Sequence, residues 1–510
     1  MRILIWHGWL LEGAGSNVYT ARVSAVWRSR GHDVLLVCQE PHPERFDFID
    51  AWGAVDAQRL SDLRSGATGS TAGGRVILLR PSIGPLLPVF VYDEYEGFEV
   101  KRFVDCSAEE LEAYLERNVA ALKTAAQWHG SDAVIAGHAV PGPVVARRAL
   151  GTRRYVAKIH GSDLEYAVRL QDRYQRLAAE GLGEAVSVVG ASEDVLRRTV
   201  ELVPEASTRT LVVNPGVDVA RFRPTNPREA LGRAAERLAH DPEVGRGRPA
   251  DLDDEVRGAV EWRDRRALDE LALRYDQDVP DPDTAARLQE LGAGDGPLVG
   301  YIGKFIPQKG VHLLLAALAE MPSRPRSLLI GFGLWREWLA ALLLALDSAD
   351  HDAVAWLEAQ MEDPTGLTAD AVDGAAGLAS SVAFMGRLDH RYAPECLAAL
   401  DVLVVPSILD EAFAMVTAEG AAAGAMPLVA RHSGLAEVAG VLEREVDRPG
   451  LFSFEPGPGA TERIAAGLDR LLSLSASERG ELRTAVSAAV SREWTWEQTA
   501  ERLLAAARSD

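Results

Sequence analysis

Two lysines stand where a predicted strand gives way to a predicted helix. The apolar run Leu298–Ile302 ends at Gly303, Lys304 follows at once, and Lys309 and Gly310 precede an apolar helical stretch. A helix N-terminus offers unpaired N–H groups and the positive end of the helix dipole, so two ammonium groups beside it suit a diphosphate. For either lysine taken alone, a solvated surface position is the alternative. The spacing predicts an anion site after this strand.

Two glutamates follow another apolar run, Val402–Val405. Glu411 lies just before a predicted helix and Glu419 lies within it. A carboxylate accepts two hydrogen bonds from neighbouring hydroxyls, so one glutamate could hold a sugar ring and the other a ribose. Glutamates near a helix start also complement the helix dipole, and that structural role is an equal alternative for either residue alone.

Two further groups of polar residues lie in the first half of the chain. The Gly-rich loop around Gly13, Gly15 and Ser16 follows the first predicted strand, and glycines there permit a close approach of the backbone to an anion. A tight turn with Ser16 as the helix N-cap would need the same residues. His160 and Asp163 end a later strand, where the histidine could contact a sugar, and a packing or capping role is the alternative for both.

Short apolar runs rich in β-branched residues alternate with helical stretches in both halves of the chain. This rhythm predicts an α/β fold with mostly parallel sheets covered on both faces. Ligands bind such sheets beyond the carboxyl ends of the strands, where all four groups lie. The predicted strands are 3–6, 33–38, 76–79, 133–136, 155–160, 186–189 and 211–214, then 298–303, 327–331, 382–386, 402–406 and 427–430.

The rhythm also predicts how the chain divides. We expect an N-terminal Rossmann-like domain over 1–225, a charged linker with a helical insertion over 226–295, and a second Rossmann-like domain over 296–490. An Ala- and Asp-rich stretch at 346–380 reads as a helical excursion, and 491–510 as a C-terminal helix.

Composition excludes several classes of protein. At 510 residues the chain exceeds one ordinary hydrophobic core, which favours two domains. Its formal charge of −21 argues against nucleic acid and anionic membranes as general partners. The N-terminal apolar run is too short for a signal peptide, and no run is long enough to span a bilayer, so we expect a soluble, cytoplasmic protein. The three cysteines read as buried, reduced thiols.

In this order the motifs resemble the retaining glycosyltransferase family 4, the group 1 glycosyltransferases that include glycogen synthase and sucrose synthase. The resemblance covers about three quarters of the chain, outside the two insertions. It rests on the Gly-rich loop and the motifs that begin at Arg30 (RGHDV), His160 (HGSD) and Asn214 (NPGVD), followed by Lys304 and Lys309, the GFG turn at 331–333, and Glu411 with Glu419, which continue to Glu437.

The resemblance implies the GT-B fold, two Rossmann-like domains facing a central cleft, and transfer of a hexose from a nucleoside-diphosphate sugar to an acceptor hydroxyl with the anomeric configuration kept. It assigns catalytic roles to Lys304, Lys309, Glu411 and His160. The donor-binding residues it implies are Gly13, Gly15, Gly303, Phe413, Ala414, Met415, Val416 and Glu419, and those on the acceptor side are Asp163 and Ser16. It implies no cofactor and no metal, since no His/Asp/Glu cluster has the spacing of metal ligands.

The chain departs from the family pattern at two places in the donor motifs. Lys304 stands where the family has arginine, which keeps the charge but loses the bidentate fork. The pattern EGFG becomes Glu411-Ala-Phe-Ala414, which adds two methyl groups where the backbone meets the sugar. These changes bear on which sugar fits.

Other readings of the chain remain open at this point. One is a binding protein of the same fold without catalysis, against which the combination of Lys304, Lys309, Glu411 and Glu419 argues. Another is a sugar epimerase or a phosphorylase of the same architecture, because fold alone does not choose among them. Peripheral membrane contact through Arg147, Arg148, Arg153 and Arg154 is a less favoured reading, since charge runs are usually solvated.

Overall fold

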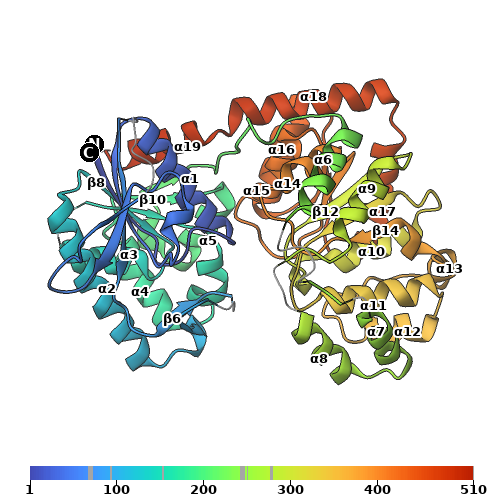
Figure 1. The fold of residues 1–510 in the computed structure, drawn as a ribbon, viewed down its shortest axis with the longest axis horizontal. Coiled ribbons are helices and arrows are strands. Elements are labelled where there is room, and N and C mark those ends of the chain that lie inside the picture. The colour runs from blue at the N-terminus through green and yellow to red at the C-terminus, as the bar shows by residue number, and fades with distance from the viewer. Residues whose placement is uncertain are drawn as a thin grey trace. The chain divides into compact units, whose positions relative to one another are not determined.

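The computed structural model describes residues 1–66, 73–91, 95–151, 154–241, 247–249, 251–275 and 279–508. The chain forms two compact units, one of Met1–Gly216 with Trp494–Asp510 and the other of Val217–Glu493 (Figure 1). Each unit is built around a mainly parallel sheet with helices on it, which confirms the predicted α/β class.

The first unit contains a nine-stranded sheet in the order β11-β10-β9-β8-β1-β2-β5-β3-β4. Its strands pair in parallel, except that β4 runs antiparallel to β3. A separate parallel pair joins β6 and β7. The strands are β1 (Arg2–Trp6), β2 (Asp33–Val37), β3 (Ala51–Val55), β4 (Arg64–Ser65), β5 (Val76–Pro81), β6 (Leu86–Val89), β7 (Glu99–Arg102), β8 (Ala133–Gly137), β9 (Val156–Lys158), β10 (Ser187–Gly190) and β11 (Thr210–Val212).

The helices of the first unit include one from the far end of the chain. Trp27 donates its indole N–H to the carbonyl of Ala500 at 3.0 Å, and Thr499 donates to the carbonyl of Asn214 at 2.8 Å. These bonds tie the C-terminal helix to the unit that begins the chain. The helices are α1 (Gly15–Ser29), α2 (Ala108–His129), α3 (Gly142–Leu150), α4 (Asp172–Leu182), α5 (Glu193–Leu202) and α19 (Trp496–Ala506).

The second unit contains a six-stranded parallel sheet in the order β14-β13-β12-β15-β16-β17. The strands are β12 (Leu298–Ile302), β13 (Arg326–Ile330), β14 (Val382–Phe384), β15 (Val402–Val405), β16 (Met426–Ala430) and β17 (Ser453–Phe454). The helices are α6 (Pro227–Ala239), α7 (Leu252–Glu261), α8 (Arg265–Tyr275), α9 (Thr284–Ala293), α10 (Val311–Glu320), α11 (Arg336–Asp347), α12 (His351–Glu358), α13 (Ala369–Gly374), α14 (Ala393–Ala399), α15 (Met415–Ala422), α16 (Ser433–Glu445), α17 (Ala460–Leu472) and α18 (Ala476–Glu493).

Each strand predicted from the apolar pattern is present. The strands that sequence reasoning missed are short or carry residues that weaken the pattern: β3 contains Gly53, β6 contains Pro88, β7 is polar, and β4 and β17 have two residues each. The charged stretch 226–295 forms helices α6 to α9 of the second unit, and 346–380 contains α12 and α13.

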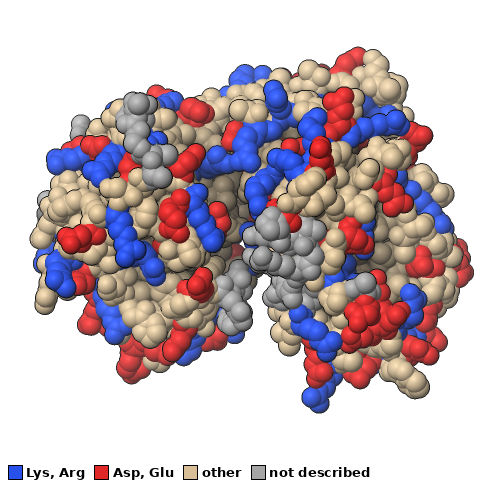
Figure 2. Space-filling model, viewed as in Figure 1, with Lys and Arg blue, Asp and Glu red and all other residues tan. Residues whose placement is uncertain are grey.

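Charged side chains of both signs lie on the visible surface, and the cysteines lie in the interior. Figure 2 shows Lys and Arg side chains interspersed with Asp and Glu over the visible face, so the charge of −21 is not gathered in one patch there. Cys38, Cys106 and Cys396 are buried and unbridged, as predicted, and burial raises the pKa of each thiol. Within the described residues, no helix is both long and apolar enough to cross a membrane.

Candidate active site

The loop that carries Lys309 is held against the loop that carries Glu411. β12 and β15 are neighbouring parallel strands, so their carboxyl ends open at the same edge of the sheet. Gly310 has a φ of 66°, and a Cβ at this position would lie 2.0 Å from the carbonyl oxygen of Pro406. The amides of Ile408 and Leu409 also donate to the carbonyl of Gln308, at 2.8 and 3.1 Å. Backbone contact therefore fixes the two loops together.

This contact brings the two predicted side chains into an ion pair. The Lys309 ammonium donates to Oε1 of Glu411, and the Ser407 hydroxyl donates to the same oxygen at 2.7 Å. The backbone amide of Glu411 donates a hydrogen bond to the Ser433 hydroxyl at 2.9 Å, and this bond fixes the backbone at Glu411. Burial raises the pKa of Glu411, but Lys309 and Ser407 outweigh it and hold the pKa below its ordinary value. The carboxylate is thus ionised beside a lysine.

The backbone after Glu411 leads directly into α15. Phe413 is buried, while Met415 and Val416 form the first turn of the helix, where amide groups lack partners within the helix. Ala414 is the N-cap and has φ 60° and ψ 68°, the left-handed region that favours glycine. The chain keeps an alanine where the backbone geometry suits a glycine, at a cost of about 1 kcal/mol.

Glu419 lies in the interior of α15 and pairs with a residue from another loop. Its Oε1 lies 3.5 Å from Nε2 of His390, and the carboxylate side chain is 13% exposed. His390 in turn packs edge-on against Phe222, with ring centroids 6.1 Å apart. The carboxylate therefore sits in a partly enclosed position with a polar partner.

Lys304 lies beside the turn that follows the neighbouring strand. Its ammonium is 5.2 Å from the ring centroid of Phe332, within the 331–333 turn after β13. The amide of Gly303 donates to the carbonyl of Ile330 at 3.0 Å, and the amide of Phe305 donates to Phe332 at 2.7 Å. Lys304 thus belongs to the β12–β13 edge, whereas Lys309 belongs to the β12–β15 edge.

The Gly-rich loop of the first unit leads into α1. Gly13 lies in the loop, and Gly15 and Ser16 are the first residues of the helix. The N-cap is Ala14, without a side-chain capping bond, so the interpretation of Ser16 as the N-cap is wrong. The reason is that the helix starts at Gly15, two residues before Asn17, where a helix capped by Ser16 would start. The side-chain amide of Asn17 instead donates a hydrogen bond to the carbonyl of Glu12 at 2.5 Å.

His160 joins a cluster of polar side chains at the carboxyl ends of β1, β8 and β9. Its ring lies 4.6 Å from that of His138 and 5.5 Å from that of Tyr19, centroid to centroid. His7 Nε2 bonds Oδ1 of Asn17 at 2.8 Å. Burial lowers the pKa of His7 to about 4 and lowers the pKa values of His138 and His160 well below the ordinary value. The three imidazoles are therefore neutral at physiological pH.

Lys158 and Asp163 complete this cluster in different ways. The Lys158 ammonium donates to the carbonyl of Ile159 at 3.1 Å and lies 4.9 Å from the Tyr19 ring, and burial lowers its pKa to about 7. Asp163 is fully buried, and its two oxygens accept the amides of Ala139 and Gly161, the latter at 2.7 Å. Its carboxylate therefore holds the loops after β8 and β9 in place.

Sequence reasoning missed several residues of both groups. These residues contact or adjoin the predicted ones and lie at or shortly after the carboxyl ends of strands: Ser407, Ser433, His7, His138 and Lys158. His138 also has a φ of 69°, unusual for a residue other than glycine, and its Nδ1 is buried without a partner among the described residues. Strand ends scanned for every polar residue, rather than for motifs, would have found this histidine.

Sequence comparisons bear on the second unit. Residues 284–489 match the profile of the family described as Glycosyl transferases group 1. The GDP-mannose-dependent alpha-(1-6)-phosphatidylinositol monomannoside mannosyltransferase of Mycolicibacterium smegmatis is 37% identical over 91 residues. That alignment covers 17% of this chain and 24% of the relative, so the likeness spans about a quarter of the curated relative's length.

Comparison with solved structures concerns the whole chain. A sucrose-phosphate synthase from Thermosynechococcus elongatus aligns over 99% of this chain and 97% of its own, with a TM-score of 0.58 and 16% identity. The Anabaena protein HepE, in a complex with UDP-glucose, aligns over 99% and 98% with a TM-score of 0.58 and 15% identity. At this identity the likeness establishes the fold, and the neighbours are glycosyltransferases with two Rossmann-like domains, the GT-B fold.

Proposed function

Because this chain has the GT-B fold and carries a group 1 glycosyltransferase domain over residues 284–489, we propose that it is a retaining glycosyltransferase. It moves a hexose from a nucleoside-diphosphate sugar to an acceptor hydroxyl. Solved neighbours with this fold are described as bound to UDP-glucose, or to ADP with acarbose, which supports a nucleotide sugar as the donor class.

The contact between Lys309 and Glu411 is the observation that carries the proposal. In a nucleotide sugar the diphosphate and the sugar are joined directly, so groups that recognise each must be neighbours. Lys309 lies at the start of α10, where its ammonium and the helix dipole favour an anion. Glu411 lies beside it, ionised, and accepts hydrogen bonds from hydroxyls. A diphosphate beside a sugar suits this pair.

The chemistry follows from the charge that develops on the donor. As the bond between the anomeric carbon and the diphosphate oxygen breaks, negative charge grows on the leaving phosphate. The acceptor hydroxyl attacks the same face of the sugar and its proton passes to the departing phosphate, which keeps the anomeric configuration. Fixed positive groups stabilise the leaving phosphate most in the transition state, so Lys304 and Lys309 lower the barrier. On this proposal the lysines neutralise the diphosphate without a metal.

Some of the other predicted residues are proposed to bind the rest of the donor. Glu419 binds the ribose hydroxyls, and the backbone at Phe413, Ala414, Met415 and Val416 lines the donor. His160 contacts the transferred sugar through a neutral imidazole, whose low pKa lets one ring nitrogen accept a hydrogen bond.

Thermal stabilisation of the full chain tests the donor class. UDP, GDP, ADP and the corresponding glucose and mannose nucleotides are added with Mg²⁺ or with EDTA. A ligand that binds only the folded state raises stability by RT ln(1 + [L]/Kd), so one base should stand out at millimolar concentration. The shift should vanish in Lys309→Ala and persist in Lys123→Ala, a lysine on the exposed side of α2.

Two further measurements distinguish the proposed reaction from an inverting reaction and from binding without catalysis. Product analysis by NMR should find the anomeric configuration of the donor in the new linkage, and an inverted linkage would contradict a retaining reaction. Nucleotide binding without any turnover, over a broad acceptor panel, would favour the non-catalytic binding protein.

A further inference from the structure

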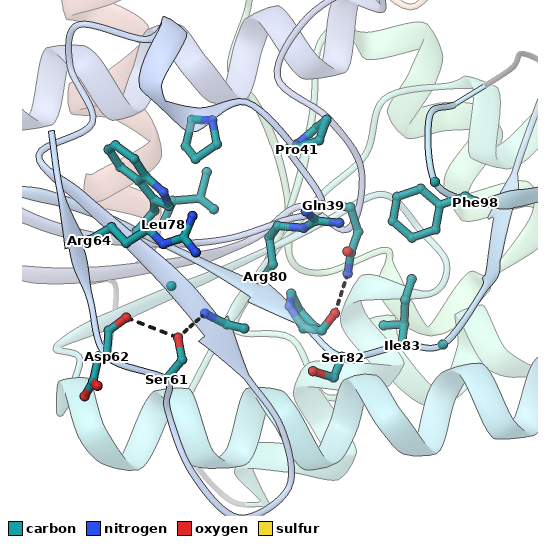
Figure 3. Close-up of a pocket in the computed structure, with 17 residues that line it drawn as sticks. Gln39, Pro41, Ser61, Asp62, Arg64, Leu78, Arg80, Ser82, Ile83 and Phe98 are labelled. Atoms are coloured by element: carbon teal, nitrogen blue, oxygen red, sulfur yellow. Dashed lines mark hydrogen bonds between the residues drawn. The ribbon is translucent and has the colours of Figure 1, made fainter.

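A hollow of about 550 Å³ lies in the first unit, and none of the residues assigned above lines it (Figure 3). It is bordered by β3, β4 and β5 and by the segments that follow β2 and β5, where Gln39 and Ser82 lie. Small-molecule sites usually measure roughly 300 to 1,000 Å³. The hollow is therefore large enough for a sugar-sized metabolite.

The register of the sheet places two arginines along this hollow. Leu78 of β5 pairs with Trp52 of β3, and Trp52 pairs on its other side with Arg64 of β4. Two residues further along β5, Arg80 pairs with Ala54. Residues that pair, and residues two apart on a strand, share a face of the sheet. The small side chain of Ala54 leaves room on that face, and Figure 3 shows both guanidinium groups reaching into the hollow.

The arginines have few partners of their own. Arg80 lies over the ring of Phe98 at 6.0 Å, and within the described residues neither Arg80 nor Arg64 takes part in an ion pair. Among the described lining residues Asp62 alone is acidic, and its carboxylate points away from both guanidinium groups in Figure 3. Arg64 is exposed and Arg80 is half-buried, so both guanidinium groups are accessible, and in a chain with a formal charge of −21 they give this hollow a local positive charge that suits an anion.

We propose that this hollow binds the phosphate group of a phosphorylated, sugar-sized metabolite that is distinct from the nucleotide sugar. A phosphate monoester presents three oxygens, which two guanidinium forks can bind in bidentate fashion. The exposed Ser82 adds a hydroxyl donor. The rings of Trp52 and Phe98 supply flat apolar surface for the carbon skeleton.

The site is separate from the polar cluster of the same unit. In the strand order, β5 is four positions from β9, the strand that ends at His160. Neighbouring strands lie about 4.8 Å apart, so the two strands are roughly 19 Å apart. A phosphate held by Arg64 and Arg80 therefore leaves the loop around His160 unoccupied.

Calorimetric titration of the full chain tests the proposal with three probes: glucose 6-phosphate, glucose and inorganic phosphate. We expect saturable binding of glucose 6-phosphate at least tenfold tighter than binding of glucose, with inorganic phosphate weaker than the ester. The double variant Arg64→Met, Arg80→Met should weaken binding of the ester at least tenfold. The matched control Arg176→Met removes an exposed arginine from α4 and should leave binding unchanged.

Equal affinity for glucose and its phosphate, or unchanged affinity in the double variant, would overturn the site. Thermal unfolding of the same variants shows that the chain is folded, and nucleoside diphosphate titrations report on the donor site independently. A failure of the proposed function therefore leaves this result readable.

A second experiment separates this site from the acceptor site. With the nucleotide sugar present, we expect glucose 6-phosphate to bind without being consumed, because a sugar phosphate held by Arg64 and Arg80 does not reach across the roughly 19 Å to the strand that ends at His160. Consumption of glucose 6-phosphate that is lost in the double variant would overturn the separation of the two sites.

Discussion

Both units place titratable side chains beyond the carboxyl ends of parallel strands. The histidines of the first unit are neutral, whereas the lysine and glutamate of the second unit are charged. In the first unit, burial lowers the pKa values of His7, His138 and His160, so these three imidazoles are neutral. In the second unit, Lys309 and Glu411 form an ion pair, and the pKa of Glu411 lies below its ordinary value. One group offers neutral donors and acceptors, and the other offers fixed charge.

This difference in charge indicates which part of the substrates each group of side chains fits. Neutral imidazoles hydrogen-bond hydroxyls without a strong preference for anions, which fits a sugar or an acceptor. A lysine beside a helix start and a paired carboxylate fit a diphosphate next to a sugar. If the contrast is functional, loss of charge in the second unit should cost more than loss of a polar group in the first.

The largest effect is expected from Lys309→Ala. Removal of one preorganised positive group from the leaving diphosphate should lower kcat by a factor of at least about 100. Steady-state kinetics with the donor that the thermal stabilisation panel selects would measure it. Lys123→Ala serves as the control, and a loss smaller than about threefold would exclude the proposed role of Lys309.

A smaller effect is expected from Glu419→Gln. The substitution keeps the size of the side chain but removes the charge that strengthens hydrogen bonds to ribose hydroxyls, so the Kd for the nucleoside diphosphate should rise about tenfold. Titration calorimetry would measure it, with Glu462→Gln on the exposed side of α17 as the control. An unchanged Kd would remove the ribose role.

The neutral histidines are expected to affect the pH dependence of the unfolding free energy. His7 has a pKa of about 4 in the folded protein and about 6.5 when unfolded, so between these values the unfolded chain binds the additional proton. The stability that depends on neutral His7 is fully present above pH 6.5 and is lost as the pH falls through 4. His7→Gln should therefore reduce the pH slope of the unfolding free energy of the first unit by about 1.4 kcal/mol per pH unit in this window.

Hydrogen exchange of β1 and β8 would report on the first unit separately. Gln127→Ala, which replaces an exposed residue of α2 that does not titrate, is the control and should leave the slope as it is. A slope that does not change in His7→Gln would mean that the histidine is charged in the folded protein.

The smallest effect is expected from Ala414→Gly. Glycine relieves the left-handed backbone at the α15 N-cap but increases the entropy of the unfolded chain, and the two effects are each about 1 kcal/mol or less. Chemical denaturation should find a stability change within about 1 kcal/mol. A larger loss would show that the Ala414 methyl group packs, and a change in donor preference would show that it selects the sugar.

The apolar rhythm predicted the sheets and the positions of the site loops well. Buried parallel strands favour apolar runs rich in β-branched residues, as in Val402–Val405, and such runs are visible without any tertiary information. The missed strands β3 and β4 lack that signal, because Gly53 interrupts one and the other has two residues. They border the arginine hollow, which for this reason had no counterpart in the sequence analysis.

The sequence by itself determined the α/β class and which side chains follow which strands, since both depend on local periodicity. Only the tertiary structure decided which of these side chains meet. Lys309 and Glu411 are 102 residues apart and touch because β12 and β15 are neighbours in the sheet. Arg64 and Arg80 share a hollow because β3 separates their strands by one position. Strand order arises from packing over the whole chain, and no local pattern encodes it.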